Sequence, residues 1–144
     1  MSDFTRKEVQ LAIMNGGTIN LQGADLSGIN LSKLCLIGAN LSHACLADAD
    51  LGDADLTNAN LEGADLEDAY LLSAILINAN LQHANLRNAN LNEAFLFDAN
   101  LSYANLEDAG LEDAHIEDAN FSNAKITEEQ LSTVYTEKKS EEKA

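Results

Sequence analysis

The chain is poor in basic residues, and it contains no proline, the residue type that most restricts the backbone. Its 144 residues hold eight Lys and Arg against 24 Asp and Glu, for a net charge of −16, with two cysteines and no proline or tryptophan. The lack of proline leaves every backbone N–H free to donate in a hydrogen-bond ladder. The acidic balance argues against direct binding of nucleic acid, because the phosphates would be repelled.

Targeting and membrane-spanning signals are also missing. The first residues, Met1 to Glu8, lack the apolar region of a signal peptide. No apolar run reaches the length of about 18 residues that a membrane helix needs. Two cysteines favour free thiols in a reducing compartment over a disulfide framework. These absences predict a cytoplasmic protein that does not span a membrane.

A period of five residues is the most abundant feature of the sequence. Leucine occupies every fifth position nineteen times from Leu21 to Leu111, and alanine stands two places earlier eighteen times from Ala39 to Ala124. A helix turns by about 100° per residue, so a five-residue step would spread these leucines around it. In an extended unit such as Ala59-Asn60-Leu61, the alanine and the leucine point to the same side. A turn after each unit then predicts a solenoid with both residues inside.

Several units carry a resemblance to a known family. Residues 39–43 (Ala-Asn-Leu-Ser-His), 54–58 (Ala-Asp-Leu-Thr-Asn) and 59–63 (Ala-Asn-Leu-Glu-Gly) are similar to the A(D/N)LXX pattern of pentapeptide-repeat proteins, many of them cyanobacterial. The resemblance covers 19–128 and implies an all-β solenoid, a right-handed quadrilateral β-helix of about 5.5 coils with four pentapeptides per coil. Independently, asparagine recurs at the same place in every fourth pentapeptide from Asn20 to Asn120, as an amide ladder on stacked coils would require.

The two ends of the repeat predict short helical caps, because a solenoid otherwise exposes its apolar cross-section. Thr5 with Glu8 and Thr127 with Gln130 have the spacing of capping boxes. We therefore expect a capping helix within 1–17, the β-helix over 18–127, a second capping helix over 128–138 and a disordered charged tail over 139–144.

Sorting the outward residues into columns four pentapeptides apart predicts the character of each face. The face centred on Leu21 to Phe121, called here the Asn-ladder face, carries one acid, Glu62. The face centred on Leu26 to Ile126 carries eight and is called here the acidic face. Its acids are Asp25, Asp48, Asp65, Glu67, Asp68, Glu107, Asp108 and Glu128. The acids either bind a basic partner or only keep the rod soluble.

The face centred on Leu36 to Ile116 breaks the rule of polar outward residues. Apolar side chains stack there on neighbouring coils and continue round one corner, forming what we call the apolar patch. It consists of Tyr70, Leu72, Ile75, Ile77, Phe95 and Phe97. Such a patch suits docking of another protein or of a second copy of the chain. The alternative is coil-to-coil packing that only stiffens the rod.

The sequence does not predict that candidate catalytic or cofactor-binding residues lie close together. His43 and His83 share a corner column but lie two coils apart, roughly 9–10 Å, which is too far for one metal ion. Cys35 and Cys45 point outward from opposite sides of one coil, which forbids a bridge between them. A filled convex rod offers no dry concave site. We therefore expect no enzyme activity, no cofactor, no metal and no small-molecule substrate.

These observations favour a non-enzymatic scaffold or protein-interaction module. The alternative is a DNA mimic that binds a type II topoisomerase (gyrase) or another basic DNA-binding protein, as the resemblance to quinolone-resistance members of the family implies. Those members resemble longer rods that dimerise end to end, often with a projecting loop, whereas this repeat is short and uninterrupted.

Overall fold

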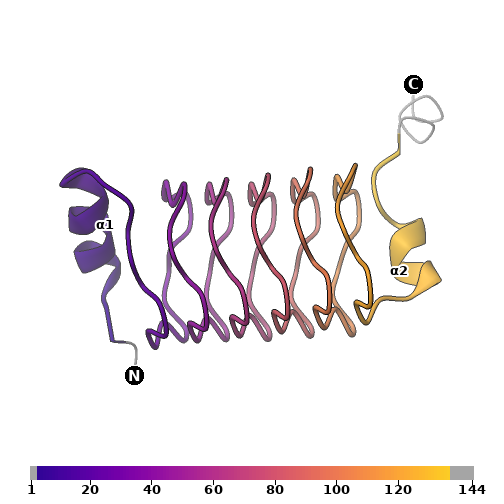
Figure 1. Ribbon diagram of the computed structural model, residues 1–144, viewed down its shortest axis with the longest axis horizontal. Coiled ribbons are helices and arrows are strands. Elements are labelled where there is room, and N and C mark those ends of the chain that lie inside the picture. Colours follow the sequence, from indigo (N-terminus) through magenta and orange to yellow (C-terminus); the bar gives the residue numbers. More distant parts are fainter. Residues whose placement is uncertain (1–2, 137–144) are drawn as a thin grey trace.

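The computed structural model describes residues 3–136 and shows a rod with a helix at either end (Figure 1). Helix α1 (Arg6–Met14) lies beside the first coil, and helix α2 (Glu128–Ser132) lies beside the last. Between them the chain winds in stacked coils. A turn every five residues and bridges between residues four pentapeptides apart give each coil four sides. Each side contributes a single bridging residue, because a turn follows too soon for a longer strand.

Vertical neighbours in the stack are four pentapeptides apart, as the asparagine column predicts. Every isolated bridge is parallel and joins residues at this one spacing, from Asn20↔Asn40 to Asn105↔Lys125. In a typical bridge the Leu41 N–H donates to the Asn60 oxygen at 2.7 Å, and the Asn60 N–H donates to the Ala39 oxygen at 2.9 Å. Each inner coil is therefore hydrogen-bonded to the coils on both sides along all four faces.

The interior is a column of leucine side chains walled by alanine. The leucines of the five-residue register from Leu26 to Leu106 are at most 1% exposed. Alanine at the preceding inward position leaves room for the leucine, since two large side chains per unit would not fit inside so narrow a coil. Burial of each leucine contributes roughly 1.5–3 kcal/mol, so the column supplies the main stabilisation of the rod.

Each five-residue turn rests on two features of the backbone. The alanine N–H donates back to the preceding leucine oxygen, as from Ala64 to Leu61 at 3.0 Å. The corner residue before that alanine has a positive φ, which is adopted by 17 non-glycine residues, Asn78 among them at 58°. Asparagine and aspartate tolerate this left-handed conformation better than other side chains, which explains their frequency at the corners.

A substitution at one corner tests this backbone requirement. Asn78→Val is expected to lower the free energy of unfolding by about 1–2 kcal/mol, because a β-branched residue pays the full steric cost of the left-handed region. Asn78→Gly is the matched control and should change stability much less, since glycine adopts this φ without strain. Thermal or urea unfolding measures both. Equal losses in the two variants would contradict the assignment of strain to the corner.

The residue between alanine and leucine has a role that the sequence did not predict. Besides forming the amide ladder, its side-chain oxygen accepts from the backbone N–H two residues on, as Asn80 does from Gln82 at 3.1 Å. The same Asn80 donates through its side-chain nitrogen to Asn60 at 3.3 Å. The turn bond needs only the oxygen, so aspartate serves as well, as Asp55 shows with Thr57 at 3.0 Å. The alternation of Asn and Asp at this position is the feature of the sequence that could have predicted this turn bond.

At the N-terminal end, α1 covers the first coil and supplies hydrogen-bond partners to its free edge. The Thr5–Glu8 capping box forms, and its hydrogen bonds to Thr5 lower the pKa of the Glu8 carboxyl. Val9 is 1% exposed and joins the core. The Arg6 guanidinium donates to the backbone oxygens of Asn30 at 3.1 Å and Ser32 at 3.0 Å. A side chain thus replaces the coil that would otherwise lie below that face.

At the C-terminal end the structure differs from the expected helix over 128–138, because α2 ends at Ser132. The following residues return to the ladder: the Asp113 N–H donates to the Thr133 oxygen and the Tyr135 N–H to the Ala114 oxygen, both at 2.9 Å. Val134 is 6% exposed and covers the core there. Ladder bonds on an open coil edge outcompete further helical turns. The predicted tail over 139–144 lies outside the described residues.

Candidate interaction surfaces

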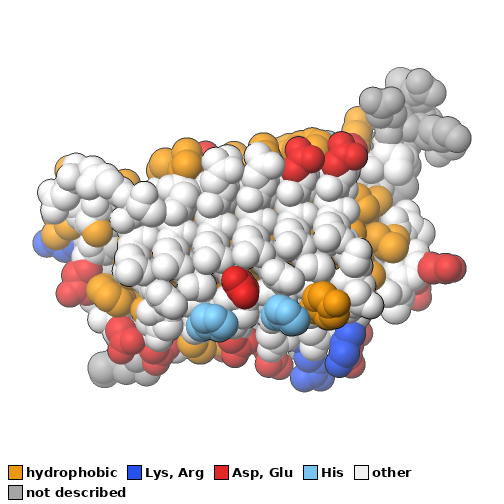
Figure 2. Space-filling model, viewed as in Figure 1, with side chains coloured by type: hydrophobic (Ala, Val, Ile, Leu, Met, Phe, Trp, Pro, Cys, Tyr) orange, Lys and Arg blue, Asp and Glu red, His pale blue; other side chains and the backbone are white. Residues whose placement is uncertain are grey.

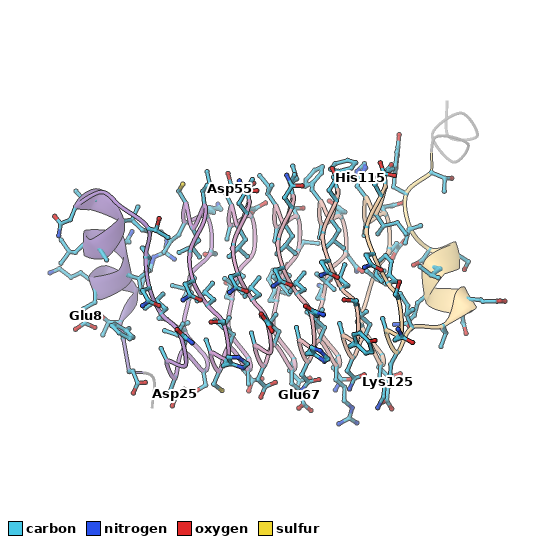
Figure 3. The ribbon with its side chains drawn as sticks, viewed as in Figure 1. Glu8, Asp25, Asp55, Glu67, His115 and Lys125 are labelled. Carbon is cyan, nitrogen blue, oxygen red and sulfur yellow. The ribbon has the colours of Figure 1, made fainter. Side chains whose placement is uncertain are left out.

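The apolar patch and the acidic face lie on opposite sides of the rod. Figure 3 places Asp55 and His115, which belong to the column of the apolar patch, along one side, and Asp25, Glu67 and Lys125 along the other. Faces centred on Leu26 and Leu36 are two sides apart in a four-sided coil, so this arrangement follows from the register of the bridges. A partner that meets one of these surfaces therefore leaves the other free.

The structure places the six predicted patch residues on two adjoining faces of neighbouring coils, and five of the six are partly buried. Ile75 and Phe95 are bridged neighbours in one ladder. Tyr70 is 44% exposed, whereas the remaining patch side chains are half-buried. The Tyr70 ring packs over Gly52, where an added Cβ would lie 3.1 Å from the ring. Coil-to-coil packing and an outward apolar surface coexist here, because stacked side chains cover one another's faces and leave their outer edges in water.

Aromatic rings extend the apolar patch toward the C-terminal end. The His115 ring stacks on Phe95 with centroids 5.0 Å apart and an interplanar angle of 9°, and it meets Phe97 at 5.5 Å. On its other side it meets Tyr135 at 4.4 Å. The sequence-based patch stopped at Phe97, although His115 and Tyr135 continue the same column. Tyr135 enters it only because the chain returns to the ladder after α2.

Carboxylates surround the apolar patch. They come from the two corner columns that border the face and from positions between the apolar residues. The set is Asp53, Asp55, Glu93, Asp98, Asp113, Glu117 and Asp118. Lys33, in the first coil, is the one basic residue of these columns among the described residues. The surface thus combines an apolar centre with a negatively charged rim.

The acidic face is less uniformly negative than its list of acids implies. Arg87 forms an ion pair with Glu67 at 3.3 Å, and Lys125 lies two coils further along the same face, so eight acids are set against two bases. Asn85 donates to Asp65 at 3.0 Å. Hydrogen bonds from the Ser27 hydroxyl and the Ser27 backbone lower the pKa of Asp25. The acids of this face are therefore partly engaged in hydrogen bonds within and between coils.

The Asn-ladder face carries few charges. The face seen in Figure 2 has this character: it is mostly white, with a single acidic side chain near its centre. One corner column beside it holds histidine and tyrosine. His83 stacks on Tyr103 with centroids 4.9 Å apart. The His43 ring fills the space above Gly63, where a Cβ would lie 2.5 Å from Nδ1. These rings pack along the corner and do not converge.

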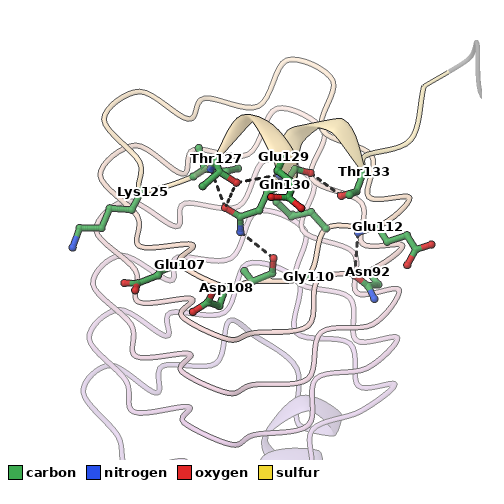
Figure 4. Close-up of a pocket in the computed structure, with 13 residues that line it drawn as sticks. Asn92, Glu107, Asp108, Gly110, Glu112, Lys125, Thr127, Glu129, Gln130 and Thr133 are labelled. Atoms are coloured by element: carbon green, nitrogen blue, oxygen red, sulfur yellow. Dashed lines mark hydrogen bonds between the residues drawn. The ribbon is translucent and has the colours of Figure 1, made fainter.

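A cavity of about 740 Å³ lies between α2 and the last coil (Figure 4). Gln130 fixes α2 above it: its side-chain nitrogen donates to the Leu106 oxygen at 2.7 Å and to the Ala109 oxygen at 3.0 Å. Asn92 reaches from the coil below to accept from the Glu112 N–H at 3.0 Å, a bond that Gly110 has no side chain to make. The cavity exists because a five-residue helix covers the coil incompletely.

Neither a metal site nor a membrane-spanning helix is found within residues 3–136. In this range, no group of three or more His, Cys, Asp or Glu side chains is placed to hold a metal ion. The helices described there are too short and too polar to cross a membrane. Cys35 and Cys45 are both free thiols, the first exposed and the second half-buried.

Parallel one-residue bridges at a constant spacing, with leucine inside and a turn every five residues, define a β-solenoid repeat protein. The chain belongs to the pentapeptide repeat family. The model for Pentapeptide repeats, in eight copies, matches residues 19–53, 35–71, 54–93, 74–113 and 94–128. Proteins of this family fold as right-handed quadrilateral β-helices, and they are generally structural or interaction modules rather than enzymes.

Solved structures similar to this chain include cyanobacterial members of the family. A pentapeptide repeat protein from Cyanothece 51142 is 39% identical over 69% of this chain and 62% of its own, with a TM-score of 0.47. This chain thus spans less than two thirds of that relative. One from Nostoc Pcc 7120 is 34% identical over 64% and 78%, with a TM-score of 0.39. The full-length plasmid-mediated fluoroquinolone resistance protein QnrB1 is 20% identical over 74% and 67%, with a TM-score of 0.34. No curated protein matches the chain.

Proposed function

We propose that this chain is a non-enzymatic protein-binding module of the cytoplasm. Its rod holds the side chains of the apolar patch at a constant spacing and presents them to another protein. Its acidic face is a second surface, which a different partner can bind independently. Ladder bonds on all four faces make the rod stiff, so it can present these side chains without ordering them on binding. The exposed free thiol of Cys35 suits a reducing compartment.

The observation that carries this proposal is the apolar patch with its acidic rim. Aromatic side chains such as those of Tyr70, Phe95 and Phe97 are enriched at protein interfaces, and an apolar surface around them suits the desolvated centre of an interface. The acidic rim selects a partner whose own apolar surface is bordered by lysine or arginine. It disfavours pairing of two patches, because a second copy would bring a matching acidic rim against the first.

Substitution of two patch residues tests the proposal. The double variant Ile77→Ser with Phe95→Ser is expected to weaken capture of the partner from an extract of the native cell by about tenfold or more, the effect of losing one interface anchor. Tyr103→Ser is the matched control, since it removes an exposed aromatic ring elsewhere on the rod. Circular dichroism verifies the fold. Equal capture by wild type and double variant would rule out the patch as the docking surface.

A second candidate, mimicry of DNA, rests on the density of charge along the rod. Between positions 19 and 128 there are 18 acids and three bases, and each coil holds four pentapeptides. Coils about 4.8 Å apart then carry roughly one net negative charge per 1.8 Å, close to the value of about 1.7 Å for double-stranded DNA. This density would attract the positively charged DNA-binding surface of a type II topoisomerase or another DNA-binding protein.

A supercoiling assay decides the second candidate. If the chain mimics DNA, micromolar protein should inhibit gyrase supercoiling, or protect the enzyme from a quinolone, and added salt should weaken the effect through screening. Absence of both effects would remove this candidate and leave the binding-module proposal intact, because that proposal depends on the apolar patch.

A further inference from the structure

Helix α1 has an outward face that the fold leaves uncovered. Val9 and Ile13 point to the solenoid, where Val9 is 1% exposed and Ile13 packs on the core. Residues at the opposite side of the helix, Lys7, Leu11 and Met14, follow the i, i+4, i+7 spacing of a single stripe. Leu11 is 49% exposed and Met14 is 81% exposed. The helix is thus apolar toward the rod and partly apolar away from it.

The N-terminal end concentrates the exposed apolar side chains of the described residues. Within residues 3–136, five large hydrophobic residues are exposed: Leu11, Met14, Ile37, Tyr70 and Tyr103. Three of these five lie in α1 or in the first coil, where Ile37 is 51% exposed. Leu11 and Met14 lie together on the outer face of α1 and form a small apolar surface at that end of the rod, where another molecule can make contact.

The same end is electrically neutral. Residues 3–17 contain Asp3 and Glu8 against Arg6 and Lys7, so their net charge is zero, while residues 19–128 carry 18 acids against three bases. Association of two such chains side by side would place one set of acids against the other. Association through α1 would separate the two rods by two helix diameters, roughly 20 Å, beyond the Debye length of about 8 Å at physiological salt.

We propose that two copies of this chain associate end to end through the outward face of α1, with Leu11 and Met14 at the centre of the contact. A second copy is the occupant that the charges favour, because a basic partner would be drawn to the acidic rod rather than to its neutral end. Two short helices bury little area, so the dimer falls at the weak end of specific interfaces. This inference is independent of the proposed binding function.

Sedimentation velocity of the full chain, from about 1 µM to about 1 mM, tests the proposal across the range of weak association. We expect a reversible rise toward twice the monomer mass at physiological salt, and a weaker one at about 0.01 M salt, where the Debye length of about 30 Å exceeds the separation of the rods. Leu11→Gln with Met14→Gln should abolish it, and both substitutions keep good helix formers on the outer face. Lys7→Glu should weaken it by making the end negative, without touching the core.

The controls separate this dimer from the proposed binding function. Tyr103→Gln removes an exposed ring away from α1 and should dimerise like wild type, and so should Ile77→Ser with Phe95→Ser, which is designed to affect partner capture alone. A wild-type chain that stays monomeric throughout would overturn the proposal. Undiminished association of the Leu11→Gln, Met14→Gln variant would also overturn it, as would loss of the dimer in the Tyr103→Gln control.

Discussion

Leu71→Ala is expected to lower the free energy of unfolding by about 3–4 kcal/mol, the largest single effect predicted for this chain. Leu71 is fully buried in the middle of the leucine column, between Leu51 and Leu91 of the adjacent coils. Shortening it leaves a void that the coils cannot close, because ladder bonds on every face hold their spacing. The loss therefore includes the cost of a cavity as well as the lost transfer energy.

The adjacent residue provides a matched control for this prediction. Leu72→Ala removes the same atoms one position along the chain, where the side chain is half-buried on the surface. We expect a loss of about 1 kcal/mol or less, because little apolar area returns to water and no cavity forms. Urea unfolding monitored by circular dichroism compares the two variants. Similar losses at both positions would contradict the inward and outward assignment of the repeat.

Gln130→Glu is expected to destabilise the C-terminal end by about 2–3 kcal/mol, although the two side chains have the same shape. Glutamate retains the oxygen that accepts from the Thr127 N–H at 2.9 Å. It loses the nitrogen that donates to the Leu106 and Ala109 oxygens, and it places a charge against both carbonyls. The capping box alone is thus predicted to be insufficient to keep α2 on the last coil.

Two comparisons make the result specific. Gln130→Ala should cost less than Gln130→Glu, because it removes the donor without adding repulsion, and Glu129→Gln at an exposed neighbouring position should be close to neutral. Amide hydrogen exchange should show faster exchange in the last coil of the Gln130 variants, with the central coils unchanged, as expected for a solenoid whose repeats contact only their neighbours. Uniform acceleration along the rod would contradict this local role.

The interior of the rod was predictable because its signal is repeated and strictly spaced. A five-residue period cannot produce an apolar stripe on a helix, so Leu61 and Ala59 have to point inward from an extended unit. The column from Asn20 to Asn120 predicts the spacing of four pentapeptides that all the bridges show. Which residues face outward followed by exclusion, and the apolar patch was named on that basis.

The ends and the details of the surface were not predictable in the same way. The repeat stops at the ends, and contacts there join segments that follow no common pattern. The expected helix over 128–138 ends at Ser132, since Thr133 and Tyr135 find ladder partners on the last coil. The contact of Arg6 with the carbonyls of Asn30 and Ser32 joins segments that share no pattern. The exposure of Leu11 and Met14 likewise depends on how α1 packs on the first coil.

The sequence by itself determined which side of each unit is buried, the turn that ends each pentapeptide and the stacking of every fourth pentapeptide, because these depend on local geometry repeated along the chain. Only the tertiary structure decided how the ends are covered, how far His115 and Tyr135 extend the apolar patch, and which face of α1 remains open. Those features depend on contacts between parts of the chain that share no repeat. Several segments there could pair with the same backbone groups or cover the same apolar surface, and only the folded structure shows which of them does.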